Sequence, residues 1–464
     1  MCCGCYNTTT MKVLHWLLFL LLMIGLLLIV QPADTITSSF VQRAAELEST
    51  VDYASAAAFL RLALVRQPWN AALYLRLAET LAAQRDEAGA EQAWQQAQAL
   101  GVDAAIVVAQ RAAFAEQSQQ TEVAAGWWEQ AVAARPADQD AVRRLIAAYV
   151  RDQRWNEART AAEQWAARWP SSADAHLKLA QLLAVDDPIA ARDHLRQAQI
   201  DKARPYLTAL DQPDAALRLQ LLGRVYLNDN ETQLAQRAFQ AAIAANPNYA
   251  EAYAYSGFMA DQLGGDGRAL LDRAVEVDRD LVVARYFRAW HWRQRGDLDR
   301  AESDLLHAIE LDPANAAIAA ELGRVYTQRS NYAEAEKWLL KARDLQPRAA
   351  EMWTALAELY VGRSYGTPDQ MLATAQQIVN LTPDDAEAHV WLGRAYLLTG
   401  DRGGAERELT TAARLNPRSA AAHLYLGRLF GRSTEAGRIE YERAQALDPD
   451  GPIGLAAKRA LELP

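Results

Sequence analysis

The most reactive side chains in this sequence of 464 residues are three cysteines at its N-terminus, Cys2, Cys3 and Cys5. Cys2 and Cys5 have the C-x-x-C spacing of zinc and haem sites, but no second pair and no neighbouring histidine accompanies them. Lipidation beside a membrane anchor is another use of such cysteines. We interpret residues 1–12 as a short N-terminal tail. The body has no cysteine, so we expect no disulfide framework there.

The other candidate groups do not form a catalytic pattern. His389 and His423 are 34 residues apart, and this regular spacing favours packing within a repeat over a metal site. Residues 264–267 (GGDG) have no preceding strand and so do not predict a phosphate-binding loop. The motifs G-x-x-x-x-G-K-[ST], H-E-x-x-H and C-x-x-C-H do not occur. We therefore expect no enzyme activity, no cofactor and no metal.

Prolines indicate the elements that must position any functional residues. Four pairs are each separated by 34 residues: Pro136 and Pro170, Pro213 and Pro247, Pro313 and Pro347, and Pro383 and Pro417. A fixed period of this length is typical of stacked helical repeats. One helix pair cannot bury its apolar face alone, so neighbouring pairs must stack. The expected product is an extended surface suited to binding.

The repeat has a readable register when the third residue after each proline is position 1. Positions 4, 7, 8 and 11 then share one face of a first helix, and positions 20, 24 and 27 share one face of a second. Glycine recurs at position 8 and alanine at position 20, which allows the two backbones to approach closely. Large apolar residues at position 24 would fill the space beside them: Phe239, Leu305, Leu339 and Leu409. In turns such as residues 295–297 (RGD) and 399–401 (TGD), the glycine suits a helix C-cap and the aspartate an N-cap.

This pattern resembles the tetratricopeptide repeat. Residues 222–247 (LGRVYLNDNETQLAQRAFQAAIAANP) and 322–347 (LGRVYTQRSNYAEAEKWLLKARDLQP) follow its consensus closely. The resemblance covers residues 35–450, about twelve units. It implies an all-α fold, a right-handed α-solenoid of helix pairs that binds peptides or protein surfaces in a concave groove.

The domain organisation follows from where the period fails. The interval from Pro170 to Pro213 is 43 residues, which places an irregular insertion, a candidate hinge, at residues 205–212. We expect an N-terminal array over residues 31–204 and a C-terminal array over residues 213–449. Residues 450–464 are expected to form a C-terminal capping helix.

The resemblance also implies which residues line the groove. Position 9 is arginine in four units, and aromatic residues gather at positions 5, 6 and 9 of others. The predicted groove residues are Arg224, Tyr255, Phe258, Tyr286, Phe287, Trp290, Arg324, Trp391, Arg394, Tyr425 and Arg428. One interpretation is a surface for an extended or helical partner segment with acidic groups, since arginine presents a planar fork to carboxylates. The other is that each arginine pairs with a nearby carboxylate such as Glu321 or Glu358, and that the rings pack between units.

Residues 13–30 (VLHWLLFLLLMIGLLLIV) contain no Asp, Glu, Lys or Arg. As a helix they would span ~27 Å, close to the hydrocarbon core of a bilayer. We expect an uncleaved transmembrane helix, with a cleaved secretory signal as the alternative. Lys12 precedes the run, and no Lys or Arg follows it before Arg43, which favours repeats on the extracytoplasmic side over the cytoplasmic side.

These observations predict a single-pass, membrane-anchored scaffold that recruits or assembles protein partners. Its partners would be a protein or peptide segment with acidic groups and the lipid bilayer through residues 13–30. The net charge of −10 and the absence of a basic stripe argue against nucleic-acid binding. Two alternatives remain: a constitutive structural subunit of a larger membrane complex, and an envelope polysaccharide or secretion accessory protein.

Overall fold

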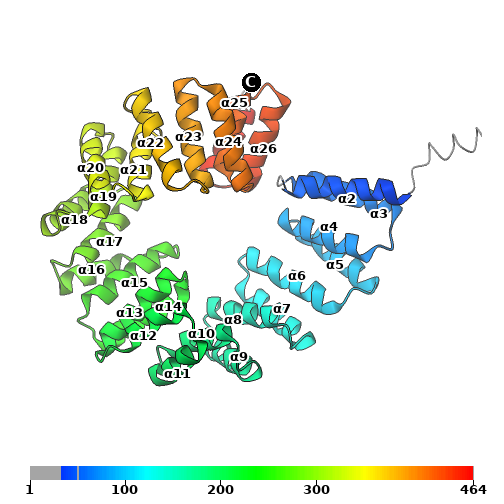
Figure 1. Cartoon of the computed structure of the whole chain (residues 1–464), viewed down its shortest axis with the longest axis horizontal. Coiled ribbons are helices and arrows are strands. Elements are labelled where there is room, and N and C mark those ends of the chain that lie inside the picture. The colour runs from blue at the N-terminus through cyan, green and yellow to red at the C-terminus, as the bar shows by residue number, and fades with distance from the viewer. Residues whose placement is uncertain (1–32, 50–51, 463–464) are drawn as a thin grey trace, which may run out of the picture. The chain divides into compact units, whose positions relative to one another are not determined.

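The computed structural model describes residues 33–49 and 52–462. In these residues it has 26 α-helices, one short 3₁₀-helix and no strand (Figure 1). The fold is therefore all-α, as the sequence predicts. The chain divides into two compact units, residues 1–135 and 136–464.

The first unit contains three antiparallel helix pairs. Its helices are α2 (Ala33–Ser49), α3 (Tyr53–Arg66), α4 (Ala71–Ala83), α5 (Glu87–Ala99), α6 (Ala104–Gln117) and α7 (Thr121–Ala134). Consecutive helices pack on each other, and buried alanines and leucines fill the space between them.

The second unit contains nine further pairs, one inserted helix and a terminal helix. Before the insertion lie α8 (Gln139–Arg151), α9 (Trp155–Arg168), α10 (Ala173–Leu183) and α11 (Pro188–Ala198). The insertion is η1 (Asp201–Ala203) and α12 (Arg204–Leu210). After it come α13 (Ala215–Asn228), α14 (Thr232–Ala245), α15 (Ala250–Gln262), α16 (Arg268–Val277), α17 (Val282–Gln294), α18 (Leu298–Leu311), α19 (Ala316–Gln328), α20 (Tyr332–Leu345), α21 (Ala350–Tyr360), α22 (Pro368–Leu381), α23 (Ala386–Thr399), α24 (Arg402–Leu415), α25 (Ala420–Phe430), α26 (Glu435–Leu447) and α27 (Pro452–Glu462).

The turn inside a helix pair needs one residue in the left-handed region. Gly296 (φ 79°) and Gly400 (φ 87°) supply it where the sequence predicts a glycine C-cap. Asn230 and Ser330 take the same place in other pairs, each with φ 60°. An aspartate then begins the second helix in several units: Asp297 Oδ1, for example, accepts from the backbone N–H of Arg300 at 3.2 Å.

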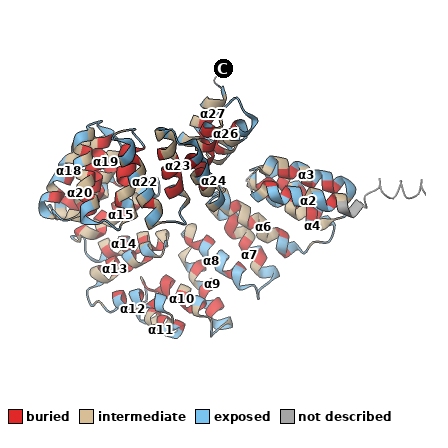
Figure 2. Ribbon diagram, turned by 45° about the horizontal axis from the view of Figure 1, so that its top comes forward, coloured by how far each residue is buried: buried red, intermediate tan, exposed pale blue. Residues whose placement is uncertain are grey.

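The core between the two helices of a pair is built as the register predicts. A Cβ on Gly323 would lie only 2.5 Å from Leu339 Cγ, and one on Gly393 only 2.6 Å from Leu409 Cγ. Position 8 must therefore be very small for the residue at position 24 to pack. Figure 2 shows buried residues on every labelled helix, and Leu339 and Leu409 are among them.

The insertion is a packed element of the second unit. Tyr206 of α12 is buried; its hydroxyl donates to Asp229 Oδ2 at 2.7 Å and accepts from Gln181 Nε2 at 2.8 Å. The Tyr206 ring also lies 5.4 Å from that of Tyr226. The two compact units meet between Arg135 and Pro136, and the hinge expected at residues 205–212 stays a prediction.

One side of the second unit is lined by the first helices of its pairs. Helix α15 contacts α17, α17 contacts α19, α19 contacts α21, and α23 contacts α25. Over the part of the chain that the structure describes, no comparably extensive contact joins one second helix to the next. The first helices thus form the more tightly curved layer. We call the surface of α13, α15, α17, α19, α21, α23 and α25 the inner face.

No helix among residues 33–49 and 52–462 is both long enough and apolar enough to span a membrane. The predicted transmembrane segment, residues 13–30, lies outside the described residues. Helix α27 lies at the end of the array on α25 and α26, in the place expected for a capping helix.

Candidate partner-binding groove

All eleven predicted groove residues lie on first helices, and five of them form one aromatic cluster: Tyr255 and Phe258 of α15 with Tyr286, Phe287 and Trp290 of α17. The Phe258 and Phe287 rings stack at 4.4 Å between centroids. Tyr255 meets Phe287 edge-on at 5.2 Å, and Trp290 meets Phe258 edge-on at 5.5 Å. These are the geometries that aromatic pairs prefer.

Phe287 departs from the prediction that all five rings are exposed. It is buried at the centre of the cluster, and the other four rings are half-buried around it. Phe287 neighbours both Tyr255 and Phe258, so the α15 rings cover it. Burial raises the pKa of the Tyr255 and Tyr286 hydroxyls. The accessible part of the cluster is therefore Tyr255, Phe258, Tyr286 and Trp290.

Arg324 of α19 is engaged by carboxylates, as the packing interpretation holds. Its Nε donates to Glu358 Oε2 at 3.0 Å, and its Nη1 lies 3.6 Å from Glu321 Oε2. Glu321 is buried and also accepts from Arg293. These groups border a cavity of about 270 Å³ on the inner face, lined by Arg293, Arg324, Thr327, Gln328, Glu358, Gly362, Arg363 and Trp391.

Arg394 of α23 has a different environment. Its guanidinium lies 4.3 Å from the centroid of Trp391 and 4.8 Å from that of Tyr425. Arg428 covers Tyr425 as well, at 4.9 Å. We call these four residues the arginine–aromatic stack. Among the described residues, no carboxylate forms an ion pair with Arg394 or Arg428.

Two groups of the stack, the Arg394 guanidinium and the Trp391 ring N–H, have incomplete polar environments. Burial lowers the pKa of Arg394, because it removes the guanidinium from part of its water, and the charge of Glu387 opposes this effect only in part. Trp391 is buried, contrary to the expectation of an exposed ring, and its Nε1 has no hydrogen-bond acceptor among the described residues. An anionic group placed here would compensate the guanidinium charge.

Arg224 of α13 is exposed. Its charge acts on Tyr255 and lowers the pKa of that hydroxyl, against the larger effect of burial. It therefore lies near the aromatic cluster. The structure thus gathers the eleven residues into the aromatic cluster with Arg224 nearby, the Arg324 ion pairs, and the arginine–aromatic stack. Their role in binding stays a prediction.

The two histidines of the 34-residue spacing pack within their repeats, as predicted. His389 Nε2 lies 2.9 Å from the Pro383 carbonyl oxygen, and its Nδ1 lies 2.7 Å from Glu408 Oε2. His423 repeats this arrangement with Pro417 at 3.0 Å and with Glu440 at 2.6 Å. Both are buried.

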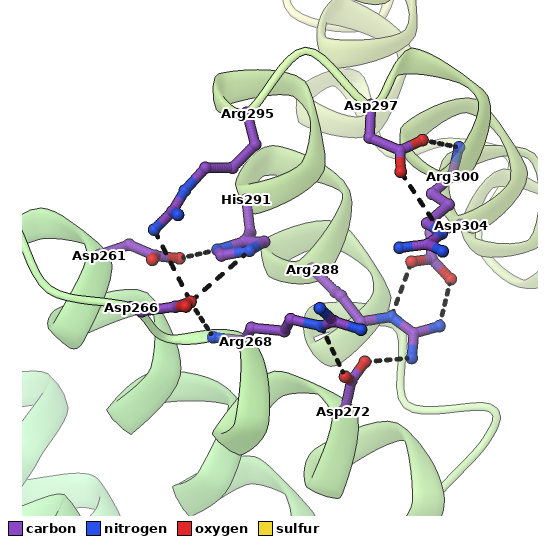
Figure 3. Close-up of polar contacts among 10 residues, drawn as sticks. All are labelled: Asp261, Asp266, Arg268, Asp272, Arg288, His291, Arg295, Asp297, Arg300 and Asp304. Carbon is purple, nitrogen blue, oxygen red and sulfur yellow. Dashed lines mark hydrogen bonds and ion pairs between the residues drawn. The ribbon is translucent and has the colours of Figure 1, made fainter.

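The GGDG turn at residues 264–267 belongs to a polar network that includes Asp261, Asp266 and His291 (Figure 3). Atoms of Asp261, Asp266 and His291 lie within 4.8 Å of one another, close enough to share a metal ion. However, Asp261 accepts from His291 Nδ1 at 2.8 Å and from the Gly267 N–H at 2.9 Å. Arg295 lies 3.7 Å from Asp266. These contacts explain why the three side chains lie together, since they hold the turn against α17. We call Asp261, Asp266 and His291 the clasp.

Beside this clasp, Asp304 forms a buried ion-pair network that the sequence pattern does not reveal. It accepts from Arg288 through both carboxylate oxygens at 2.8 Å and from Arg285 at 3.1 Å. Arg288 also reaches Asp272 at 3.1 Å (Figure 3). These residues come from α16, α17 and α18. The network therefore joins two successive pairs.

Residues 362–366 (GRSYG) match the hydrolase motif G-x-S-x-G. In the structure they form the turn between α21 and α22, with no strand before them. Ser364 has a φ of 54°, but no histidine forms a hydrogen bond with it among the described residues. The local geometry lacks the base that a serine nucleophile needs.

The fold and the inner face define a helical-repeat protein with a candidate groove. Models of the tetratricopeptide repeat family match residues 218–249, 292–359 and 399–452. The chain therefore carries tetratricopeptide repeats in these segments. No protein with a curated description matches the sequence.

Several solved structures are similar to parts or most of this chain. The yeast Tom70 structure is 17% identical, with 93% of this chain and 96% of that chain covered and a TM-score of 0.41. The Cut9–Hcn1 hetero-tetramer of the APC/C gives 16% identity, 85% and 96% coverage and a TM-score of 0.45. YrrB, described as a TPR protein with an unusual peptide-binding site, gives 22% identity, 41% and 97% coverage and a TM-score of 0.31.

Proposed function

We propose that this protein is a membrane-anchored scaffold that binds an acidic segment of a partner protein along the inner face of its second unit. The observation that carries the proposal is the arginine–aromatic stack. Arg394 is held between two rings and has no carboxylate partner among the described residues.

The physical basis is a guanidinium that is partly removed from water, forms no ion pair with a described carboxylate and is already held against two rings. Removing a guanidinium from water is unfavourable unless an anion or several acceptors replace the water. The rings of Trp391 and Tyr425 stabilise the cation through its planar face. A carboxylate from a partner would add charge-assisted hydrogen bonds.

The aromatic cluster supplies an apolar contact for the same partner. Tyr255, Phe258, Tyr286 and Trp290 keep part of their surface accessible, and such rings often dominate binding energy at interfaces. A segment with both apolar and acidic residues would fit the inner face. This composition also agrees with what the tetratricopeptide resemblance implies, namely peptide or protein binding.

The test is a selection of random peptides on the full-length chain in detergent, immobilised away from the inner face. We expect enrichment of Asp and Glu, and a Kd for the selected peptides that rises about tenfold or more in Arg394→Ala. Arg414→Ala, which removes an exposed arginine from the second helix α24, is the matched control. Equal enrichment in the Arg394→Ala protein would overturn the proposal.

The membrane part of the proposal rests on residues 13–30 and on the basic Lys12 before them. We propose that these residues form a single-pass anchor with the repeats on the extracytoplasmic side. Extraction of membranes at alkaline pH should leave the chain in the pellet. Protease added to sealed spheroplasts or vesicles of known orientation should report which side carries the repeats.

A further inference from the structure

The first unit exposes an unusual group of apolar and basic residues at the end of α3. Val65 is 79% exposed, Trp69 is 70% exposed and Leu62 is 48% exposed. Arg61 and Arg66 are exposed beside them. Neither arginine forms an ion pair with another described residue. We call these five residues the α3 patch.

The register of the α2–α3 hairpin places this patch at a defined end of the first unit. The two helices pack antiparallel (Figure 1), and Phe40 of α2 lies 6.1 Å from Phe59 of α3. Moving six residues toward the N-terminus of α2 and six toward the C-terminus of α3 reaches residues 34 and 65. Val65 is therefore level with the first turn of α2.

The first turn of α2 lies close in sequence to the apolar run. That run ends at residue 30, and α2 begins at Ala33. Three residues can span at most ~11 Å. The headgroup layer on one side of a bilayer is ~5–8 Å thick. If residues 13–30 cross the membrane, the first turn of α2 lies within ~11 Å of the hydrocarbon core, which brings the α3 patch within reach of the headgroups.

The chemistry of the patch suits that location. Tryptophan is enriched at membrane interfaces, where one part of the ring is apolar and its N–H meets water. Arginine attracts anionic headgroups and can extend its charge toward water. A bilayer would cover Leu62 and Val65, which water otherwise surrounds.

We propose that the α3 patch rests in the headgroup layer of an anionic bilayer and so fixes the first unit against the membrane. This inference rests on the membrane attachment proposed above. It adds a second contact, made by a folded helix pair, to the anchor itself.

Spin labels provide the test. In a chain with Cys2, Cys3 and Cys5 replaced by serine, a label is attached at Val65→Cys or, as the matched control, at Ala54→Cys. Ala54 is exposed on the same face of α3, ~16 Å nearer its N-terminal end. The full-length proteins are placed in nanodiscs of phosphatidylcholine and phosphatidylglycerol. Collision rates with O₂ and with a water-soluble nickel chelate are then measured by EPR.

The expected result is a ratio of O₂ to nickel collisions that is several-fold higher at position 65 than at position 54. Equal, water-like ratios at the two positions, in chains that remain in the discs, would overturn the proposed contact between the α3 patch and the bilayer. They would leave the proposed anchor intact. A chain that fails to enter the discs would overturn the proposed membrane anchor, and with it the proposed bilayer contact of the α3 patch. A label at position 65 shielded from both reagents would show that protein covers the patch, which also contradicts the proposal.

Discussion

The inner face of the second unit has two regions that use equivalent repeat positions differently. In α17–α21, arginines and carboxylates compensate each other: Glu321 engages Arg293 and Arg324, and Glu358 engages Arg324 as well. In α23–α25, Arg394 and Arg428 stack on rings and have no carboxylate partner among the described residues. The same repeat position therefore carries an ion-paired arginine in one repeat and an arginine stacked on rings, without an ion pair, in another.

The largest effect should come from the compensated region. Glu321→Gln removes a buried carboxylate and leaves Arg293 and Arg324 without it. We expect a loss of about 3–5 kcal/mol in the free energy of unfolding, because a buried pair that loses one partner leaves an uncompensated charge. Urea denaturation followed by circular dichroism measures it. A loss below ~1 kcal/mol would mean that water already compensates these arginines.

Phe287→Ala tests the centre of the aromatic cluster. The ring is buried against Tyr255 and Phe258, so its truncation should cost about 3–5 kcal/mol of folding stability. Trp290→Ala, which removes a half-buried ring, should cost less in stability but weaken peptide binding. If Trp290→Ala destabilises the fold as much as Phe287→Ala, then Trp290 belongs to the core and not to the binding surface.

Gly323→Ala and Gly393→Ala test whether the two helices of a pair pack equally closely beneath the two regions. Each new Cβ would meet a leucine of the second helix, Leu339 or Leu409, at less than 3 Å. We expect both variants to lose a similar ~1–3 kcal/mol through overpacking, seen as matched shifts in Tm. Unequal losses of stability would show that the helix packing of the two regions differs as well as their surfaces.

Arg394→Ala should have the smallest effect on stability. It removes two cation–π contacts but also a partly desolvated charge, and these terms oppose each other. We expect a change within ~1 kcal/mol in the free energy of unfolding, together with the loss of acidic-peptide binding. A large destabilisation with unchanged binding would assign Arg394 to packing.

Much of the helix-pair packing can be predicted from the spacing of residues within one repeat. The spacing of glycine, alanine and large apolar residues predicts helix pairs and also which faces meet. The structure confirms this at Gly323 with Leu339 and at His389 with Pro383. These features are predictable because they depend on residues within one repeat and on the fixed geometry of a helix.

The site could be predicted only in part. Register assigns Phe287 and Trp391 to the groove, yet both are buried. Rings of the neighbouring helix α15 cover Phe287, and Trp391 belongs to a core cluster that it shares with α21 and α22. The clasp of Asp261 with His291 was also beyond the pattern, since the two residues are 30 positions apart and belong to different helix pairs.

By itself the sequence determined the helical repeat, its register and the residues that lie on first helices, because these depend on periodic local spacing. Only the tertiary structure decided which arginine forms ion pairs and which stacks on rings without one. That depends on whether a carboxylate such as Glu358, 34 residues from Arg324, comes within hydrogen-bond distance. No such partner among the described residues reaches Arg394. Partner placement of this kind is set by the stacking of neighbouring pairs, which no local period encodes.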